Sequence, residues 1–369
     1  MNRQIALVIL SLLILSCKGG RAAGTLPPVT SDDPAVVTPS GDPSRDASAE
    51  PSAEPSPDPS EEPSEEPSPD PSVEPSEEPS QDPAPEPFTL TVDGDAMRVV
   101  FSGRSTGGEN LLLTLAPVSA NHTVQLDQYT IGNESFRSYT DWVGPWNMRT
   151  VASTSQTEKA WGFTGGWHGS NGDGTGDPTA RTQRIAVVAD GEPVPMGTVQ
   201  AREASCTVYN LVEAANTKFD DAKRFVLEET VTYTFRGGRL YVSLEARALE
   251  DVRVTVYYGM QIANGFCSRF TFTTEDGTES ETTTSLLVKG KVREMTGYSA
   301  GGHRVIAHMD PEGLGAYNLA TTAYSALTQY YGANNGKGYY MLIGDKDGGK
   351  PYTFRKDETL FWSGYYEFR

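Results

Sequence analysis

The sequence predicts an all-β fold, a large antiparallel β-sandwich, that follows a disordered, proline-rich arm. Short runs that alternate apolar and polar residues recur through residues 88–369 and are rich in Val, Thr, Tyr and Phe, as half-buried strands are. Helical patterns are scarce over the same residues. A single sandwich of either a jelly-roll or a longer double-sheet "supersandwich" form therefore fits this length. Residues 1–87 lack the alternation altogether.

Residues 1–16 predict a signal peptide. Arg3 precedes an apolar run from Ile5 to Leu15, which is too short to span a bilayer comfortably. The run ends in Ile14-Leu15-Ser16-Cys17, which resembles the lipobox of bacterial lipoproteins. The resemblance implies a lipid on Cys17 and a protein anchored at the bacterial outer membrane or cell surface without spanning it. The alternative is an ordinary secretory signal in which Cys17 has no such role.

Residues 17–87 predict a spacer. From Glu50 an acidic residue followed by proline recurs every four residues as far as Glu86-Pro87. Proline fixes φ and removes a hydrogen-bond donor, and the segment has almost no apolar side chains to bury. An extended polyproline-II-like stalk of about 3.1 Å per residue follows. A ligand for a proline-binding partner and a calcium-binding acidic tract are the alternatives.

The arm also accounts for most of the acidity. Of 49 acidic residues 17 lie in residues 1–87, together with 18 of the 25 prolines and only 4 of the 30 basic residues. Residues 88–369 keep 32 acidic and 26 basic residues. These totals suggest no basic face, so we expect no nucleic-acid partner, whereas an acidic glycan remains compatible with the domain.

The strands and turns of residues 88–369 follow from period-two runs and glycine-containing turns. The runs predict strands at residues 88–92, 184–189, 230–235, 239–245, 252–257, 271–274 and 285–292. Turns are expected at Asp190-Gly191, at Gly237-Gly238 and at residues 275–277. Short helices are expected within residues 210–221 and 319–329.

The order strand, turn, strand, gap, strand between Glu228 and Gln261 resembles the sugar-binding sandwiches of the galactose-mutarotase-like kind. The resemblance implies a supersandwich and a carbohydrate ligand. Cys206 and Cys267 are the two cysteines beyond the signal peptide. Sequence leaves open whether they form a disulfide or remain buried thiols.

Residues 139–184 are the most unusual stretch. They hold four of the five tryptophans, Trp142, Trp146, Trp161 and Trp167, and seven glycines lie between residues 162 and 176. Long glycine-rich loops in compact domains are often functional, and aromatic faces beside polar groups suit sugar rings. Contact with a glycan and burial in the core are both compatible with these tryptophans. Because Trp142 and Trp146 flank the turn residues Gly144-Pro145, we expect this pair to be exposed.

The same stretch predicts residues for the cleavage of an acidic polysaccharide. A polysaccharide lyase needs a group that removes the proton next to a uronate carboxylate and a group that neutralises that carboxylate. The residues that we predict for catalysis are His168, Arg181, Asn147 and Tyr258, and those that we predict for substrate binding are Trp142, Trp146, Trp167, Arg149 and Gln261. A structural role for the single residue His168 is the alternative.

Sandwich lyases of the alginate-lyase type carry a Gln-x-His strand and a Tyr-x-Lys-x-Gly-x-Tyr strand. Here Ile262 and Ala263 follow Gln261, and Ser363 stands where the lysine should be. The chain therefore departs from that family at both motifs.

A cofactor is not required by these patterns. Asn171, Asp173 and Asp177 place oxygen donors at alternate positions, which suits Ca²⁺, but the position of the closing Glu in a calcium loop is Thr182. The sequence therefore leaves three functions open. They are a glycan-cleaving lyase, a surface protein that binds glycan without cleaving it, and a structural or adhesive surface domain.

Overall fold

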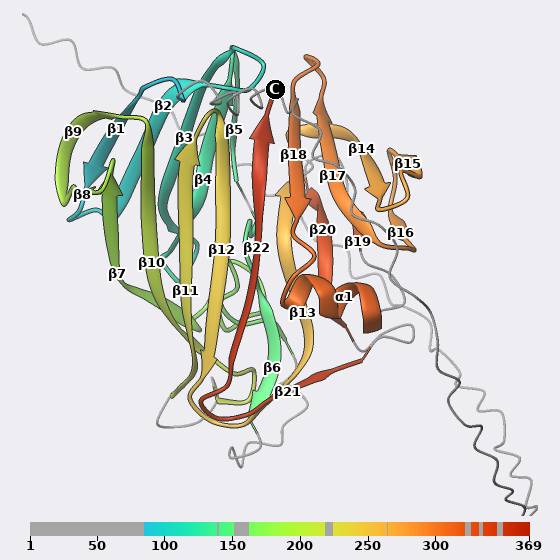
Figure 1. The fold of residues 1–369 in the computed structure, drawn as a ribbon. Helices are drawn as coiled ribbons and strands as arrows, with labels where there is room; N and C mark the ends of the chain where they lie inside the picture. The colour runs from blue at the N-terminus through green and yellow to red at the C-terminus, as the bar shows by residue number, and fades with distance from the viewer. Residues whose placement is uncertain are drawn as a thin grey trace, which may run out of the picture. The chain divides into compact units, whose positions relative to one another are not determined.

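The computed structural model describes residues 85–138, 140–150, 162–217, 224–263, 265–321, 326–331, 335–344 and 350–369. The signal peptide, Cys17, the arm up to residue 84 and Trp161 lie outside these residues. The described part is almost entirely antiparallel strands, with one α-helix (Figure 1). The predicted all-β class is therefore confirmed. No helix among the described residues is long and apolar enough to cross a membrane.

The first sheet has six strands in the order β5-β4-β3-β2-β1-β9 (Figure 1). Their bounds are β1 Phe88–Asp93, β2 Arg98–Arg104, β3 Asn110–Val118, β4 Thr123–Ile131, β5 Glu134–Arg137 and β9 Met196–Ala201. In β1 the buried and more exposed residues alternate, as the pattern of residues 88–92 predicts.

The second sheet has ten strands in the order β15-β14-β17-β18-β22-β12-β11-β10-β7-β8. Their bounds are β7 Ala180–Ala189, β8 Glu192–Pro193, β10 Glu203–Glu213, β11 Phe225–Arg236, β12 Arg239–Ala248, β14 Cys267–Thr274, β15 Glu279–Thr282, β17 Val292–Ser299, β18 Arg304–Met309 and β22 Thr359–Phe368. We call it the ten-stranded sheet.

The third sheet follows the order β16-β19-β20-β13-β21, and β6 pairs with β13 beside this path. Its bounds are β6 Trp146–Thr150, β13 Val252–Ala263, β16 Leu286–Val288, β19 Ala326–Tyr331, β20 Asn335–Gly344 and β21 Tyr352–Phe354. The helix α1, Leu314–Thr321, contacts β20 and β22.

The two smaller sheets pack on the same face of the ten-stranded sheet. Phe235 of β11 contacts Phe88 and Phe101 of the first sheet, with ring centroids 4.7 and 5.5 Å apart. Trp362 of β22 donates its indole N–H to the hydroxyl of Tyr257 of β13 at 2.8 Å. Both contacts come from the apolar positions of β11 and β22. One long sheet facing two shorter ones is the supersandwich form of the two that the sequence left open.

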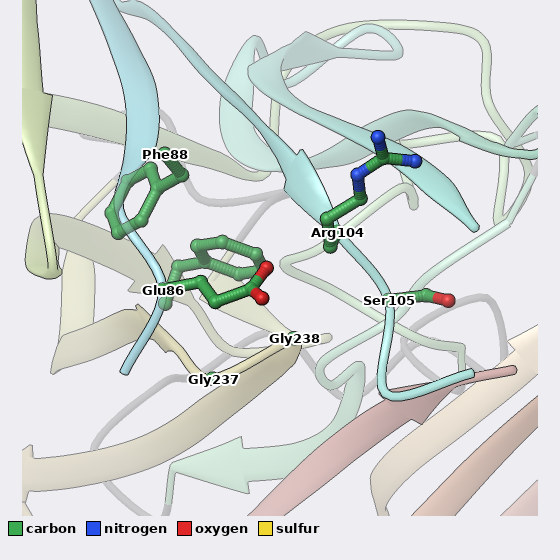
Figure 2. A pocket seen from close by; sticks show the side chains of 7 residues that line it. Glu86, Phe88, Arg104, Ser105, Gly237 and Gly238 are labelled. Carbon is green, nitrogen blue, oxygen red and sulfur yellow. The ribbon is translucent and has the colours of Figure 1, made fainter. Parts of the chain in front are cut away.

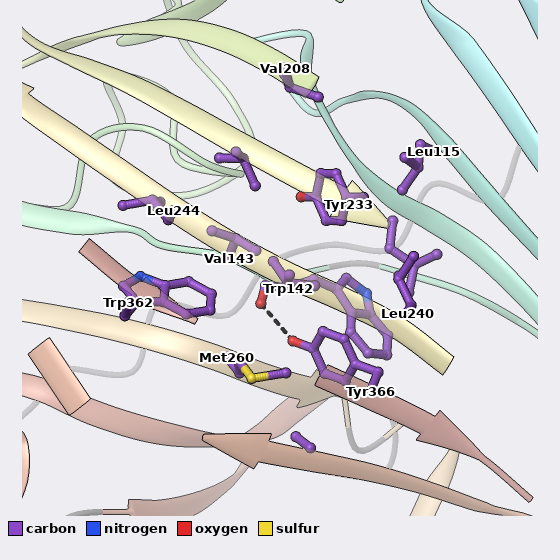
Figure 3. Packing of buried hydrophobic residues seen from close by; sticks show 14 of the residues in the cluster. Leu115, Trp142, Val143, Val208, Tyr233, Leu240, Leu244, Met260, Trp362 and Tyr366 are labelled. Carbon is purple, nitrogen blue, oxygen red and sulfur yellow. Dashed lines mark hydrogen bonds between the residues drawn. The ribbon is translucent and has the colours of Figure 1, made fainter. Parts of the chain in front are cut away.

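The hydroxyl of Tyr366 on β22 links the ten-stranded sheet to the third sheet. It donates to the Trp142 carbonyl at 2.9 Å (Figure 3). It also accepts the Gln261 N–H at 3.1 Å. Because the contact joins β22 to β13 and to the segment before β6, it holds that segment against the ten-stranded sheet.

The turns were predicted more accurately than the helices. Asp190-Gly191 joins β7 to β8, and Gly237-Gly238 joins β11 to β12 with positive φ at both glycines. The helix expected within residues 210–221 is wrong for residues 210–217, because residues 210–213 continue β10 and residues 214–217 are not α-helical, while residues 218–221 lie outside the described residues. The helix expected within residues 319–329 is only partly right, because α1 ends at Thr321 and β19 begins at Ala326. Cys206 and Cys267 are both free and buried.

Candidate functional site

Three ionisable side chains meet on the face of the third sheet that points away from the ten-stranded sheet. Asp141 is fully buried, and its Oδ2 lies 3.1 Å from Nε2 of His168 and 3.6 Å from Nζ of Lys337. The side chains of His168 and Lys337 are 17% and 12% exposed. Lys337 comes from β20, whereas Asp141 and His168 come from the segments around β6. We call these three residues the Asp141 cluster.

Three aromatic rings form a wall beside this cluster. Phe163 lies between His168 and Tyr258, with ring centroids 5.2 and 5.1 Å away. The ring of Tyr258 on β13 lies 4.1 Å from that of Tyr339 on β20, and Nζ of Lys337 lies 5.3 Å from the Tyr258 centroid. Apolar ring faces therefore stand directly beside exchangeable polar groups.

The glycine-rich segment that carries His168 is fixed by polar side chains of the β3–β4 turn. Asn121 is buried and donates from Nδ2 to the carbonyls of Gly166 and His168 at 2.9 and 3.0 Å. The hydroxyl of Thr123 also donates to the Gly166 carbonyl at 2.9 Å. Because these contacts satisfy backbone carbonyls that no strand pairs, the segment can be irregular and still well placed.

Two backbone requirements explain the glycine at residue 166. It has φ of 51°, which is the left-handed region that favours glycine. A Cβ at this position would lie 2.1 Å from Oδ1 of Asp141. The missing side chain lets the Asp141 carboxylate approach the backbone and accept the N–H of Trp167. The glycine therefore makes room for the buried carboxylate.

Each ring nitrogen of His168 faces an acceptor oxygen. Nδ1 lies 2.9 Å from the carbonyl of Gly172, and Nε2 faces Asp141. A neutral imidazole has one N–H, so only the doubly protonated ring donates to both partners. In this arrangement neither nitrogen directs a free electron pair toward a substrate. The geometry therefore suits His168 as a fixed positive charge better than as a base.

Burial and charge act in opposite directions in the cluster. Burial by itself raises the pKa of Asp141, but the charge and hydrogen bond of His168, the charge of Lys337 and the Trp167 N–H together hold that pKa below its usual value. Burial lowers the pKa of Lys337, and its attraction to Asp141 offsets this only in part. Perturbed ionisable groups of this kind are frequent at functional sites.

Several residues that the sequence predicted for the site share this face. Tyr258 contacts the cluster directly, and Asn147 on β6 pairs with Val256, which packs beside Tyr258. Arg149 lies two residues farther along the same face of β6 and is half-buried. Trp167 is also half-buried, and its backbone N–H donates to Asp141.

The expectation that Trp142 and Trp146 are exposed is wrong. They are 1% and 0% exposed. Trp146 stacks on Tyr257 with centroids 3.8 Å apart, and its indole N–H donates to Glu229 of β11. Trp142 packs edge-on against Tyr366 at 5.1 Å (Figure 3). Both belong to the core because they fill the space between two sheets, which the adjacent turn residues did not reveal.

Gln261 is likewise fully buried, and its Nε2 donates to the carbonyl of Gly144. Its amide supports the chain before β6, and its Oε1 has no hydrogen-bond partner among the described residues. The structure therefore gives Gln261 no exposed surface with which to contact a substrate.

Arg181 is not brought to the Asp141 cluster. Its guanidinium lies 4.9 Å from the ring centroid of Phe225, at the start of β11. Its neighbour Thr182 points toward the core and donates to Asn210 at 2.7 Å. Alternation along β7 thus directs Arg181 to the opposite face of the ten-stranded sheet.

The residues predicted for calcium, Asn171, Asp173 and Asp177, are exposed. Oδ1 of Asp173 accepts the backbone N–H of Thr175 at 2.8 Å and its hydroxyl, so this carboxylate closes a local turn. Among the described residues no group of three or more His, Cys, Asp or Glu side chains could hold a metal ion. Calcium binding stays a prediction.

Sequence reasoning missed Lys337 and gave Asp141 no role. Lys337 lies in Gly336-Lys337-Gly338, at the start of an aromatic run with Tyr339 and Tyr340. A single lysine between glycines ahead of a buried strand is the signal that could have identified it. Its approach to Asp141 is seen only in the structure, where Lys337 pairs with Ala263 on β13 and its Nζ lies 3.6 Å from Oδ2 of Asp141.

Two hollows lie elsewhere on the described residues. The smaller, of about 140 Å³, is lined by Glu86, Phe88, Arg104, Ser105, Phe235, Gly237 and Gly238 (Figure 2). The larger, of about 390 Å³, lies between the β1–β2 turn, the β8–β9 connection and β7. Neither contains a residue of the Asp141 cluster. The residues of the Asp141 cluster therefore lie outside both hollows.

No family model and no curated protein matches the chain. Among solved structures it is similar to the galactosidase domain of an α-galactosidase–sucrose kinase, with 6% identity and a TM-score of 0.45 over 76% of this chain and 41% of that one. An α-galactosidase from Lactobacillus brevis gives 8% identity and a TM-score of 0.43 over 75% and 40% of the two chains. A candidate aldose 1-epimerase from Escherichia coli K12 gives 7% identity and a TM-score of 0.36 over 74% and 99%.

The chain thus spans about two fifths of the length of the two galactosidase structures. These identities and scores are too low to transfer a site or an activity to this chain. The function must be argued from the chain's own residues.

Proposed function

We propose that this protein handles glycans and that its glycan site is the Asp141 cluster with the half-buried rings of Phe163 and Tyr258, which pack on the buried ring of Tyr339. The observation that carries the proposal is the position of these rings directly beside two basic side chains and a buried carboxylate. Sugar rings have apolar C–H faces that pack on aromatic rings and hydroxyls that need polar partners. The arrangement offers both within one patch of the third sheet.

The finer proposal is that the glycan is acidic and that the protein is a polysaccharide lyase. The substrate carboxylate would approach the positive charge of His168, while the hydroxyl of Tyr258, whose ring packs on Phe163, would give a proton to the leaving oxygen. Asn147 and Arg149 on the same face would extend the contact to the neighbouring sugar unit.

The second candidate is a surface protein that binds glycan without cleaving it. The observation that favours it is the arrangement of His168, whose two ring nitrogens are both occupied. If Lys337 is also protonated, the site holds cations and aromatic rings but no base. A structural or adhesive domain without a small ligand remains the third candidate.

A panel of neutral and acidic polysaccharides separates these functions. The chain from residue 18 onward would be followed by ultraviolet absorbance for unsaturated product and by retention in polysaccharide gels. Product from an acidic polysaccharide supports the lyase, and retention alone supports the binding protein. If no polysaccharide gives unsaturated product or retention, only the structural function is left.

Matched variants locate the site. Tyr258→Phe removes the hydroxyl and keeps the ring, so we expect product formation to fall about 100-fold while retention persists. His168→Ala removes a charge and a ring contact, so we expect both to weaken. Arg181→Ala, on the opposite face of the ten-stranded sheet, is the control. Equal losses in Arg181→Ala would place the glycan elsewhere.

We further propose that Cys17 carries lipid and that residues 17–87 hold the domain away from a bacterial membrane. A distance-setting arm needs an anchor at one end and a domain at the other, and the lipobox-like motif supplies the anchor. Metabolic labelling with a radioactive fatty acid should mark the wild type and not Cys17→Ser. Equal labelling of both would exclude the anchor.

A further inference from the structure

Lys337 has an unusual environment for a lysine. Its side chain is 12% exposed and its Nζ lies 3.6 Å from the Asp141 carboxylate, which is too long for a hydrogen bond. The rings of Tyr258 and Tyr339 lie 5.3 and 5.6 Å from Nζ. An ammonium group has three N–H donors, and among the described residues none of them has an acceptor within hydrogen-bond distance.

His168 competes with Lys337 for the same carboxylate. Its Nε2 lies 3.1 Å from the oxygen, Oδ2, that faces Lys337, and its Nδ1 is held by the Gly172 carbonyl. Oδ1 of Asp141 is taken by the Trp167 N–H. One buried negative charge thus faces two groups that can be positive, and an unpaired buried charge is costly.

The cluster can relieve this excess by losing one proton. Both ring nitrogens of His168 face an acceptor, whereas Lys337 has a single long contact with the carboxylate, so Lys337 holds its proton less firmly than a lysine with a close counter-charge does. The ionisable groups that face Lys337 are Asp141 from the segment before β6, Tyr258 from β13 and Tyr339 from β20, and His168 contacts the same oxygen of Asp141. Burial of Lys337 lowers its pKa in the same direction.

We propose that Lys337 gives up its proton more readily than an exposed lysine does and that, once uncharged, it is the proton acceptor of this site, acting on the C–H next to the carboxylate of an acidic sugar unit. The reaction part of this inference rests on the proposed function, whereas the protonation state of Lys337 does not. Both can therefore be tested separately.

The step balances without a further reagent. The Lys337 nitrogen takes the proton from the carbon that bears the carboxylate, and the freed electron pair forms a carbon–carbon double bond as the bond to the glycosidic oxygen breaks. Tyr258 gives its proton to that oxygen. The positive charge of His168 faces the carboxylate while the negative charge develops. Transfer of the proton from Lys337 to Tyr258 through solvent restores the site.

Competitive acetylation with a trace of acetic anhydride, read by peptide mass spectrometry from about pH 6 to about pH 11, tests the protonation state. Only an uncharged amine reacts. We expect the reactivity of Lys337 to reach its half-maximum at least about one pH unit below that of the exposed Lys356. A midpoint equal to or above that of Lys356 would overturn the proposal.

His168→Gln provides a second measurement in the folded protein. It removes the competing cation, so Lys337 becomes the one basic side chain of the cluster that faces Asp141. We expect the Lys337 midpoint to move up toward that of Lys356, while the midpoint of Lys356 stays unchanged. An unchanged Lys337 midpoint would show that His168 does not displace its proton.

Lys337→Arg tests whether residue 337 acts as a proton acceptor or only as a positive charge, because arginine keeps the charge and cannot give up its proton. We expect product formation to fall about 100-fold or more with glycan retention kept, and Lys337→Gln to lose product formation as well. Product formed by Lys337→Arg at the wild-type rate would overturn the role. If the wild type forms no product from any polysaccharide, the lyase and this role fail together, while the acetylation midpoint still decides the state of Lys337.

Discussion

Asp141 holds the candidate site together because it is a buried carboxylate shared by two basic side chains and one backbone N–H. Replacing it by alanine leaves His168 and Lys337 without their counter-charge. Removing one partner of a buried charged group costs about 3–5 kcal/mol. We therefore expect Asp141→Ala to lower the free energy of unfolding by about that amount at neutral pH, as measured by urea denaturation.

The effect of Asp141 should depend on pH in a defined direction. Its pKa is lower in the folded protein than in the unfolded chain, so its stabilisation is present above the unfolded pKa and is lost as pH falls through the folded one. The stability gap between the wild type and Asp141→Ala should narrow on acidification. A gap that widens in acid would contradict this assignment.

Glu229 should show the opposite dependence. It is fully buried, accepts the indole N–H of Trp146 and faces Nδ2 of Asn210 at 3.4 Å, and burial raises its pKa despite these hydrogen bonds. A raised pKa gives stability that is complete below the unfolded pKa and is lost as pH rises through the folded one. We expect Glu229→Gln, which cannot ionise, to become more stable relative to the wild type as pH increases. Urea titrations at a series of pH values measure this, and a difference that does not change with pH would refute it.

At the scale of elements, the glycine-rich segment from residue 162 to residue 179 is the part whose geometry the site most requires. Gly166→Ala would place a methyl group against the Asp141 carboxylate at a backbone angle that favours glycine. We expect it to weaken glycan retention and to lower the free energy of unfolding by about 2 kcal/mol or more.

Gly172→Ala is the matched control for this prediction. Gly172 also has a positive φ, of 82°, but no atom lies within 4 Å of its would-be Cβ. It should therefore lose only the backbone preference, about 1 kcal/mol, and keep glycan retention. Equal effects of the two substitutions would show that backbone strain, and not the approach of Asp141, explains Gly166.

Strands such as β1, β11 and β12 were predictable because they are half-buried and most of their residues alternate in burial along the chain. The residues from Thr230 to Phe235 alternate between intermediate and buried, as the pattern of polar and apolar side chains indicates. The helix expected within residues 210–221 is absent from residues 210–217 for a related reason. Asn210 and Glu213 are polar but buried, so they obscure the period-two pattern at the end of β10.

For the whole molecule, both free cysteines lie in a core that a reagent cannot enter. Burial raises the pKa of the Cys206 thiol to about 12 and raises that of Cys267 as well. Only thiolates react rapidly, so neither cysteine should react with a disulfide reagent such as dithionitrobenzoate until the domain unfolds. Their reaction across a urea titration should follow the global unfolding transition of a chain that lacks Cys17.

Rapid reaction of one thiol in the absence of urea would show that a sheet edge opens locally. Reducing agent should leave the melting temperature of the same chain unchanged, because no bond joins Cys206 to Cys267 in the folded protein.

The candidate site could be predicted only in part. His168, Tyr258, Asn147 and Arg149 were identified because polar, aromatic and basic side chains crowd a glycine-rich stretch and a neighbouring strand. Trp142 and Trp146 were misplaced because a tryptophan beside a turn has the same local sequence whether a sheet covers it or not. Their burial follows from contacts with β11, β13 and β22.

The sequence by itself determined the strand-rich class of residues 88–369, most turns and the division of charge between arm and domain, because alternation and glycine act over a few residues. Only the tertiary structure decided that two sheets share one face of a third, that the cysteines stay apart and that Lys337 reaches Asp141. These facts depend on the register between distant strands. A period of two residues says which face of a strand is apolar, but not which other strand will cover it.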